Sequence, residues 1–169
     1  WDIVLAIRLG KHELPVICGL ASDDSHGYHA WGVGKTNPGR GWIMVRATHL
    51  TAEAIVDGLE AGDFYSSSGV ILKDVRVENG ELKLAIQGQP GVTYRTEFIA
   101  TPKTARFDSE PRRDANGKEL PVTRVYSEEI GQVVGTSTSL TPSFKLDEKW
   151  LYVRARVISS QPHPNPFQA

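Results

Sequence analysis

The chain has 169 residues and a net charge of −1, from 19 basic and 20 acidic side chains. Its hydrophobic content of 40% and charged content of 23% are ordinary for globular proteins and exclude an intrinsically disordered chain. The balanced charge offers no electrostatic footprint for nucleic acid. No apolar run reaches the roughly 20 residues that cross a bilayer, so we expect neither a nucleic-acid partner nor a membrane span.

The first region, residues 1–70, has the pattern of an α/β fold. Ile3, Val4 and Ile7 fall on one helical face, and Gly10 is placed to end that helix. The next apolar run, Val16 to Ala21, is continuous rather than alternating, which is typical of a parallel strand buried on both faces. We therefore predict a buried strand over 15–21, with Cys18 inside it as an unreactive thiol.

A loop and a second helix complete this region. Residues 27–41 contain five glycines and one proline and predict a long loop. Thr51 is a natural N-cap for the following helix, and Leu50 with Ile55 occupies the two positions of a hydrophobic staple. Gly62 provides the stop of this helix.

The second region, residues 71–169, changes to the alternating period of β-strands. Two alternating runs flank Asn79-Gly80, which predicts a hairpin with a turn of the primed type. Residues 102–121 are rich in proline and charge and predict an exposed loop. Further predicted strands lie at 92–100, 122–126, 132–136 and 150–158, and three prolines require an extended tail over 161–166. A β-sandwich-like module is the economical interpretation.

The chemically most informative residues directly follow the predicted strand at 15–21. Asp24 and His26 are two residues apart, so on an extended segment both side chains project to the same side and can reach one ion. Oxygen and nitrogen donors suit zinc, manganese or iron. The alternative is that these residues provide only turn chemistry or a helix cap after a strand. Asp23 faces the other way and is expected either to give support, behind the ligands or as a helix or loop cap, or to be a further ligand.

Other polar and aromatic residues of the loop admit two interpretations each. His29 is a further ligand or a solvated loop histidine. Arg40 clamps an anionic substrate or only solvates a glycine-rich turn. Tyr28 and Trp31, beside the Asp24–His26 pair, are candidates for the wall of a substrate pocket. No catalytic residue separate from the metal ligands is assigned.

Several segments resemble the carboxyl-terminal part of the PHP (polymerase and histidinol phosphatase) superfamily of metallohydrolases, in particular its CehA/McbA-like group. The segments that carry the resemblance are 19–26 (GLASDDSH), 41–47 (GWIMVRA), 50–56 (LTAEAIV), 62–69 (GDFYSSSG) and 152–157 (YVRARV). Residues 101–149 match only loosely. The resemblance implies the last βα units of a distorted TIM-like barrel over 1–70, followed by an all-β, sandwich-like module over 71–169.

The resemblance also implies a function. The late Asp-x-His motif of the family falls on Asp24 and His26, which would bind a divalent metal, and the activity would be hydrolysis of a small-molecule phosphoester or a related ester or amide. The early His-x-His motif has no counterpart here, so we expect a fragment whose partner is the missing amino-terminal part of the barrel or an equivalent chain. Alone, it should be inactive. The alternative is a non-catalytic binding module that associates with a partner polypeptide.

Overall fold

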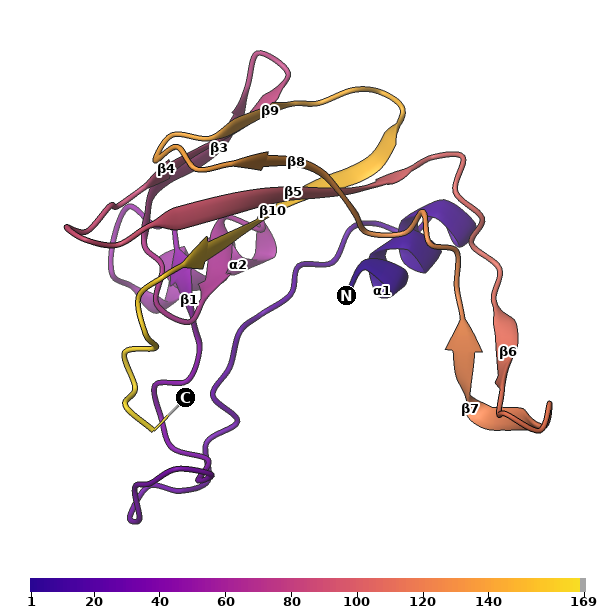
Figure 1. Ribbon diagram of the computed structural model, residues 1–169. Coiled ribbons are helices and arrows are strands. Elements are labelled where there is room, and N and C mark those ends of the chain that lie inside the picture. Colours follow the sequence, from indigo (N-terminus) through magenta and orange to yellow (C-terminus); the bar gives the residue numbers. More distant parts are fainter. Residues whose placement is uncertain (168–169) are drawn as a thin grey trace. The chain divides into compact units, whose positions relative to one another are not determined.

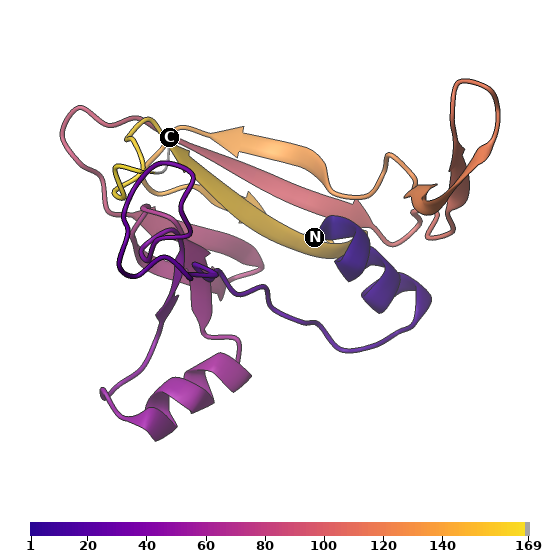
Figure 2. The ribbon, with the colours of Figure 1, turned by 90° about the horizontal axis from the view of Figure 1, so that it is seen from below.

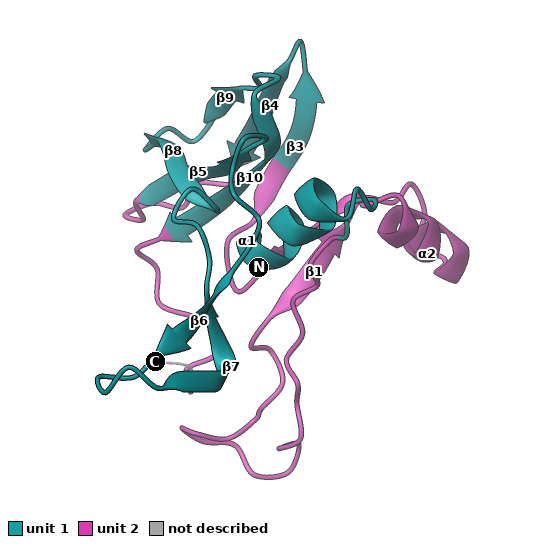
Figure 3. Ribbon diagram, turned by 90° about the vertical axis from the view of Figure 1, so that its right-hand side faces the viewer, with its two compact units in different colours: residues 1–17, 74–85, 94–158 teal, residues 18–73, 86–93, 159–169 magenta. Residues whose placement is uncertain are grey.

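A computed structural model describes residues 1–167 of the chain, and they form a mostly β protein with several small sheets (Figure 1). The chain divides into two compact units, each of which combines segments that are distant in sequence (Figure 3). The first unit comprises 1–17, 74–85 and 94–158, and the second comprises 18–73, 86–93 and the tail from Ser159 onward. Within the described residues, no helix is both long and apolar enough to cross a membrane.

The first unit begins with the predicted helix. An α-helical turn, α1 (Asp2–Ala6), continues directly into a π-helical turn, η1 (Ile7–Lys11). The predicted apolar face is wrong, because Leu5 and Ala6 are the buried residues of α1.

Gly10 does not end this helix as predicted. It lies inside η1, where a Cβ atom would come within 2.3 Å of the Phe107 ring, so the glycine is required by close packing of an aromatic side chain. A capping interpretation from sequence cannot detect a partner that lies so far along the chain.

The predicted hairpin at Asn79-Gly80 is confirmed. Strands β3 (Leu72–Glu78) and β4 (Glu81–Ile86) are joined by these two residues, whose φ values of 52° and 72° are those of a primed turn. A strand of three residues, β9 (Ser143–Lys145), pairs with β4 in antiparallel fashion and completes a sheet of order β3-β4-β9. Sequence patterning missed β9 because three residues are too few for an alternation to be recognised.

A second three-stranded sheet contains four of the nine buried hydrophobic residues among those described, all on its central strand. It consists of β5 (Tyr94–Pro102) between β8 (Gln132–Ser137) and β10 (Trp150–Ser159), which confirms the strands predicted over these parts of the chain. Phe98 of β5 is almost fully buried and stacks on Phe144 of β9 with ring centroids 5.0 Å apart. This aromatic pair joins the two sheets of the first unit.

The predicted loop over 102–121 is partly wrong, because a hairpin begins within it. Strands β6 (Glu110–Arg113) and β7 (Glu119–Val125) pair in antiparallel fashion, and β7 includes most of the strand predicted at 122–126. The Asp114 carboxylate accepts hydrogen bonds from the backbone N–H groups of Asn116 and Lys118, at 2.9 Å each, and so builds the turn. High charge and proline content predicts irregular structure, but here these residues form an exposed hairpin.

The second unit contains a two-stranded sheet and a helix. Strands β1 (Trp42–Val45) and β2 (Phe64–Ser67) pair in antiparallel fashion, and α2 (Ala52–Glu60) lies in the connection between them (Figure 2). The Thr51 cap is confirmed, because its hydroxyl oxygen accepts a hydrogen bond of 3.2 Å from the Ala54 N–H. Leu50 is 94% exposed, so the predicted hydrophobic staple does not form.

The predicted buried strand at 15–21 is wrong. This stretch is extended, but it belongs to no sheet, and Val16 and Leu20 are each 62% exposed. Its attachment to β2 is made by the Ser66 hydroxyl, which accepts from the Ala21 N–H at 2.9 Å and donates to the Gly19 carbonyl at 2.8 Å. Cys18 is likewise exposed rather than buried. A continuous apolar run predicts a covered strand only where layers cover both of its faces, and the described residues supply none.

Candidate functional site

The glycine-rich segment 23–41 forms an ordered loop around a single carboxylate. The two Asp23 carboxylate oxygens accept hydrogen bonds from three successive backbone N–H groups, those of Gly39 (2.8 Å), Arg40 (2.6 Å) and Gly41 (2.7 Å). The N–H groups of Gly41 and Gly39 contribute most to lowering the pKa of Asp23 below its ordinary value. Of the two roles predicted for Asp23, this geometry fits support of the loop.

Arg40 holds the same loop through its side chain. Its Nη2 donates to the backbone carbonyl of Asp23 and, at 3.2 Å, to that of Asp24. Its Nε is buried and has no hydrogen-bond partner. The guanidinium predicted to clamp a substrate anion is therefore directed at the backbone that carries the candidate metal ligands.

Asn37 orders the other half of the loop. It is fully buried, and its Nδ2 donates to the carbonyls of Gly27 (2.7 Å) and Ala30 (3.2 Å), while its Oδ1 accepts from the Gly32 N–H (3.1 Å). Because every polar group of a buried amide must be paired, these three contacts define one conformation of the surrounding backbone. Asn37 is not among the predicted site residues, although an asparagine before a proline in a glycine-rich stretch is a turn signal.

The two predicted metal ligands lie side by side at the surface. The Asp24 Oδ1 and His26 Nδ1 atoms are 4.0 Å apart, and the two side chains are 86% and 73% exposed. His26 Nδ1 also lies 2.8 Å from the backbone carbonyl oxygen of Asp24. Since a carbonyl oxygen can only accept, Nδ1 is the donor of this contact, and in the neutral imidazole Nε2 is then the nitrogen with a lone pair for a metal ion. Asp24 has a left-handed φ of 47°, which is uncommon for a residue with a side chain.

The pair by itself has too few donors to make a metal site. Within residues 1–167, no three or more His, Cys, Asp or Glu side chains gather in a way that could hold a metal ion. His29, predicted as a further ligand, is exposed and is not gathered with the pair. One carboxylate and one imidazole fit a divalent cation by donor type, and a zinc site would need at least one further protein ligand.

An apolar cleft of about 360 Å³ lies in the same unit. Trp31, predicted as a pocket residue, lines the cleft together with Trp42, Pro38, Gly39 and the tail residues Pro164 to Pro166. Tyr28, the other predicted pocket residue, is exposed and donates its hydroxyl to the Ser25 carbonyl at 2.8 Å.

The tail contributes two polar side chains that the sequence analysis missed. His163 Nε2 lies 3.0 Å from the Arg40 carbonyl, and Asn165 Nδ2 donates to the Pro38 carbonyl at 3.0 Å. Asn165 is only 7% exposed. The prolines around these residues indicated an extended tail, but nothing in the local pattern indicated what the tail contacts.

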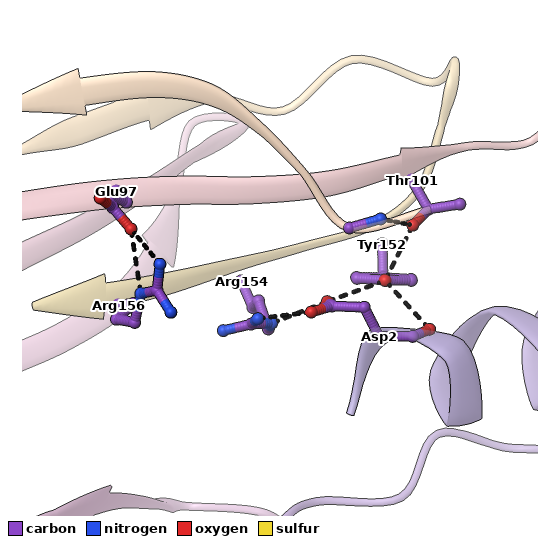
Figure 4. Close-up of polar contacts among 7 residues, drawn as sticks. Asp2, Glu97, Thr101, Tyr152, Arg154 and Arg156 are labelled. Carbon is purple, nitrogen blue, oxygen red and sulfur yellow. Dashed lines mark hydrogen bonds and ion pairs between the residues drawn. The ribbon is translucent and has the colours of Figure 1, made fainter. Parts of the chain in front are cut away.

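A second polar network lies in the first unit and connects a helix to a strand (Figure 4). The Arg154 guanidinium donates to both Asp2 carboxylate oxygens, the Tyr152 hydroxyl donates to Asp2 Oδ1 at 2.9 Å, and the Thr101 hydroxyl donates to Tyr152 at 2.8 Å. The Arg154 hydrogen bonds lower the pKa of Asp2, whereas burial raises the pKa of Tyr152. Each member is paired with another, so the network anchors α1 on β10.

Comparison of this chain with models of known protein families, with curated proteins and with solved structures gives no match. A function for this chain is therefore inferred from the geometry of the loop 23–41.

Proposed function

We propose that Asp24 and His26 are two ligands of a divalent metal ion, zinc, manganese or iron, in a hydrolase of the PHP type. The observation that carries this proposal is the hydrogen bond from His26 Nδ1–H to the Asp24 carbonyl, at 2.8 Å, beside the exposed Asp24 carboxylate. Histidines that bind metal through one ring nitrogen usually donate the other N–H to a carbonyl or carboxylate, which fixes the ring orientation. His26 meets this requirement before any metal binds.

The role of the chain is to hold and orient these two donors. Asp23 and Arg40 fix the backbone of residues 23 and 24 through the contacts described above, so the carboxylate and the imidazole start from a defined position. When bound, the metal would supply a water of lowered pKa and would polarise the phosphoester, ester or amide under attack. The small-molecule substrate would approach beside the Trp31 cleft, part of whose wall comes from the same loop.

The remaining ligands would come from another polypeptide, either the amino-terminal part of a distorted TIM-like barrel or an equivalent chain. The exposed apolar side chains of residues 14–20 support this proposal, because a barrel strand would be covered on both faces. Residues 1–70 would then be the last βα units of that barrel, and residues 71–169 the sandwich-like module. The isolated chain would bind metal weakly and hydrolyse little.

Metal binding by the purified chain tests this function. Zn²⁺ or Mn²⁺ would be titrated into the chain and into the variants Asp24→Ala and His26→Ala, with His12→Ala as the matched control on an exposed histidine. We expect each of the first two substitutions to weaken binding by about tenfold or more, because each removes one of two donors. His12→Ala should bind as the unchanged chain does. Equal metal affinity in all four proteins would mean that Asp24 and His26 serve only as turn residues and not as metal ligands.

A second candidate function is a non-catalytic module that binds a partner polypeptide. The observation that favours it is the stretch 14–20, whose apolar side chains are exposed and whose extended backbone belongs to no sheet among the described residues. Such a stretch is suited to pairing with another strand. Light scattering during size-exclusion chromatography distinguishes the cases, since a monodisperse monomer over a wide concentration range counts against self-association through this stretch.

A further inference from the structure

We propose that His163 and Asn165 of the tail are positioning residues for the Asp24–His26 pair. The proposal rests on the proposed metal-binding function. Its first step, that the tail orients the loop backbone, concerns the loop alone. The four residues Pro38 to Gly41, called here the bridge segment, connect the tail to Asp23 through two peptide units.

Asn165 orients the first of these peptide units. Its Nδ2 donates to the Pro38 carbonyl at 3.0 Å, and its Oδ1 accepts from the Phe167 N–H at 3.0 Å. The side chain is almost completely buried, so a rotation that breaks these contacts would leave a buried amide unpaired. The Pro38 carbonyl is therefore held in one direction.

His163 orients the second peptide unit. Its Nε2 lies 3.0 Å from the Arg40 carbonyl oxygen, and its Nδ1 lies 3.0 Å from the backbone N–H of Asn165. The carbonyl can only accept and the N–H can only donate, so the ring is neutral with its proton on Nε2. Both nitrogens are then satisfied, and the ring connects the Arg40 carbonyl to the tail backbone.

The same two peptide units carry N–H groups that hold Asp23. The Pro38 carbonyl and the Gly39 N–H belong to one planar peptide unit, and the Arg40 carbonyl and the Gly41 N–H belong to another. The peptide bonds here are trans, so carbonyl and N–H point in opposite directions from each unit. The tail therefore holds the carbonyl side of the bridge segment, and the Asp23 carboxylate is held at its N–H side.

Through Asp23, the fixed orientation of the bridge segment affects the position of the proposed metal ligands. It directly precedes Asp24, whose left-handed φ of 47° requires support from its surroundings. The Asp24 carbonyl accepts hydrogen bonds from both Arg40 Nη2 and His26 Nδ1. Release of the tail would free the two peptide units to rotate, Asp23 would lose its fixed donors, and the Asp24–His26 geometry would relax.

The experiment uses the whole chain with the substitutions His163→Ala, His163→Gln and Asn165→Asp, and with His12→Ala as the control. Glutamine can replace histidine here, because its amide donates to the Arg40 carbonyl and its oxygen accepts from the Asn165 N–H. Aspartate keeps the acceptor for the Phe167 N–H but loses the donor to the Pro38 carbonyl. Circular dichroism would establish that each variant is folded.

Three measurements are made on each protein. Amide exchange with water, followed by NMR, should become about tenfold faster at Gly41 in His163→Ala and at Gly39 in Asn165→Asp. The imidazole nitrogen shifts of His26 should lose the signature of a fixed Nδ1–H tautomer in both variants. Affinity for Zn²⁺ or Mn²⁺ should fall by about tenfold, the size typical for groups that orient a ligand. His163→Gln should restore all three, and His12→Ala should change none.

The outcomes separate this inference from the proposed function. Unchanged amide exchange and an unchanged His26 tautomer in the tail variants would overturn the inference, whatever the metal affinity. Faster amide exchange with unaltered metal affinity would also overturn it, because the tail would then support the loop without positioning the ligands. If the unsubstituted chain binds no metal, the proposed function fails, and the amide exchange and the His26 tautomer still decide whether the tail positions this pair.

Discussion

The Arg154 guanidinium donates two hydrogen bonds to the Asp2 carboxylate, from Nε to Oδ1 at 2.8 Å and from Nη2 to Oδ2 at 2.5 Å, across 152 residues of sequence. This bidentate pair attaches the first helical turn of the chain to β10. Both side chains are largely shielded from solvent, which makes the pair stronger than an exposed ion pair.

We expect Asp2→Asn to lower the free energy of unfolding by about 1–2 kcal/mol at pH 7, because the amide cannot accept both hydrogen bonds. Asp2 has a lowered pKa when folded, so its contribution is present above the unfolded value near 3.8 and is lost as the pH falls through the folded value. Between about pH 7 and 2.5, the free energy of unfolding measured with urea should fall less in Asp2→Asn than in the unsubstituted chain. Asp57→Asn, on an exposed position of α2, is the control, and the same pH dependence in all three proteins would contradict this assignment.

Tyr152→Phe should cost about 1–2 kcal/mol of stability, because it leaves the buried Thr101 hydroxyl without its acceptor. Burial raises the pKa of Tyr152, so this hydroxyl should remain protonated where exposed tyrosines ionise. Ultraviolet titration between about pH 9 and 11 should therefore give the same phenolate amplitude with and without the substitution. A clearly smaller amplitude in Tyr152→Phe would show that Tyr152 ionises in this range.

Gly10→Ala should destabilise the first unit by about 1–3 kcal/mol, because the new methyl group would overlap the Phe107 ring. Thermal unfolding measures the effect, and Phe107→Leu in the Gly10→Ala background should recover part of it by making room. Gly32→Ala is the matched control, since a Cβ atom there would meet only Lys35 at 3.8 Å. Equal melting temperatures for the two alanine variants would contradict the packing at Gly10.

Asp23→Asn should loosen the bridge segment, because an amide offers one acceptor oxygen where the carboxylate offers two. The pKa of Asp23 is lowered, so the loop should be fully held above about pH 4 and should loosen as the pH falls through the folded value. Amide exchange at Gly39 and Gly41 measures both effects. The neighbouring substitution Asp24→Asn should leave these amides unchanged, and faster exchange in that control would mean that the hydrogen bonds of Asp23 are not the cause.

Two local signals predicted local structure correctly, whereas the hydrophobic staple of Leu50 and Ile55 does not form. The Asn79-Gly80 turn and the Thr51 cap depend on residues within a few positions of one another, and both are confirmed. The buried strand at 15–21 is wrong because burial depends on what covers an apolar run, and the run itself does not contain that information. Gly10 illustrates the same difficulty, since its partner Phe107 is distant in sequence.

The candidate site shows the same division. The spacing of Asp24 and His26 predicted, for an extended segment, that their side chains lie together. Their nearest side-chain polar atoms are 4.0 Å apart, but the left-handed φ of Asp24 means that the backbone there is not extended as predicted. The support of the pair comes from residues that no spacing rule connects to it. Asp23 is held by N–H groups 16 to 18 residues away, and the bridge segment is held by a histidine 123 residues beyond Arg40. Backbone donors and acceptors are chemically alike at nearly every position. The sequence therefore does not reveal with which of them a distant side chain will form a hydrogen bond.

The contact between the tail and the bridge segment also determines when the loop can reach its complete set of contacts. During synthesis, residues 23–41 leave the ribosome long before His163 and Asn165, and all strands from β2 to β10 are made in the interval. The loop therefore acquires its final backbone constraints among the last events of folding, after the sheets of the first unit have been translated. A nascent chain stalled before residue 160 would contain Asp24 and His26 but would lack the tail contacts with the bridge segment that position them.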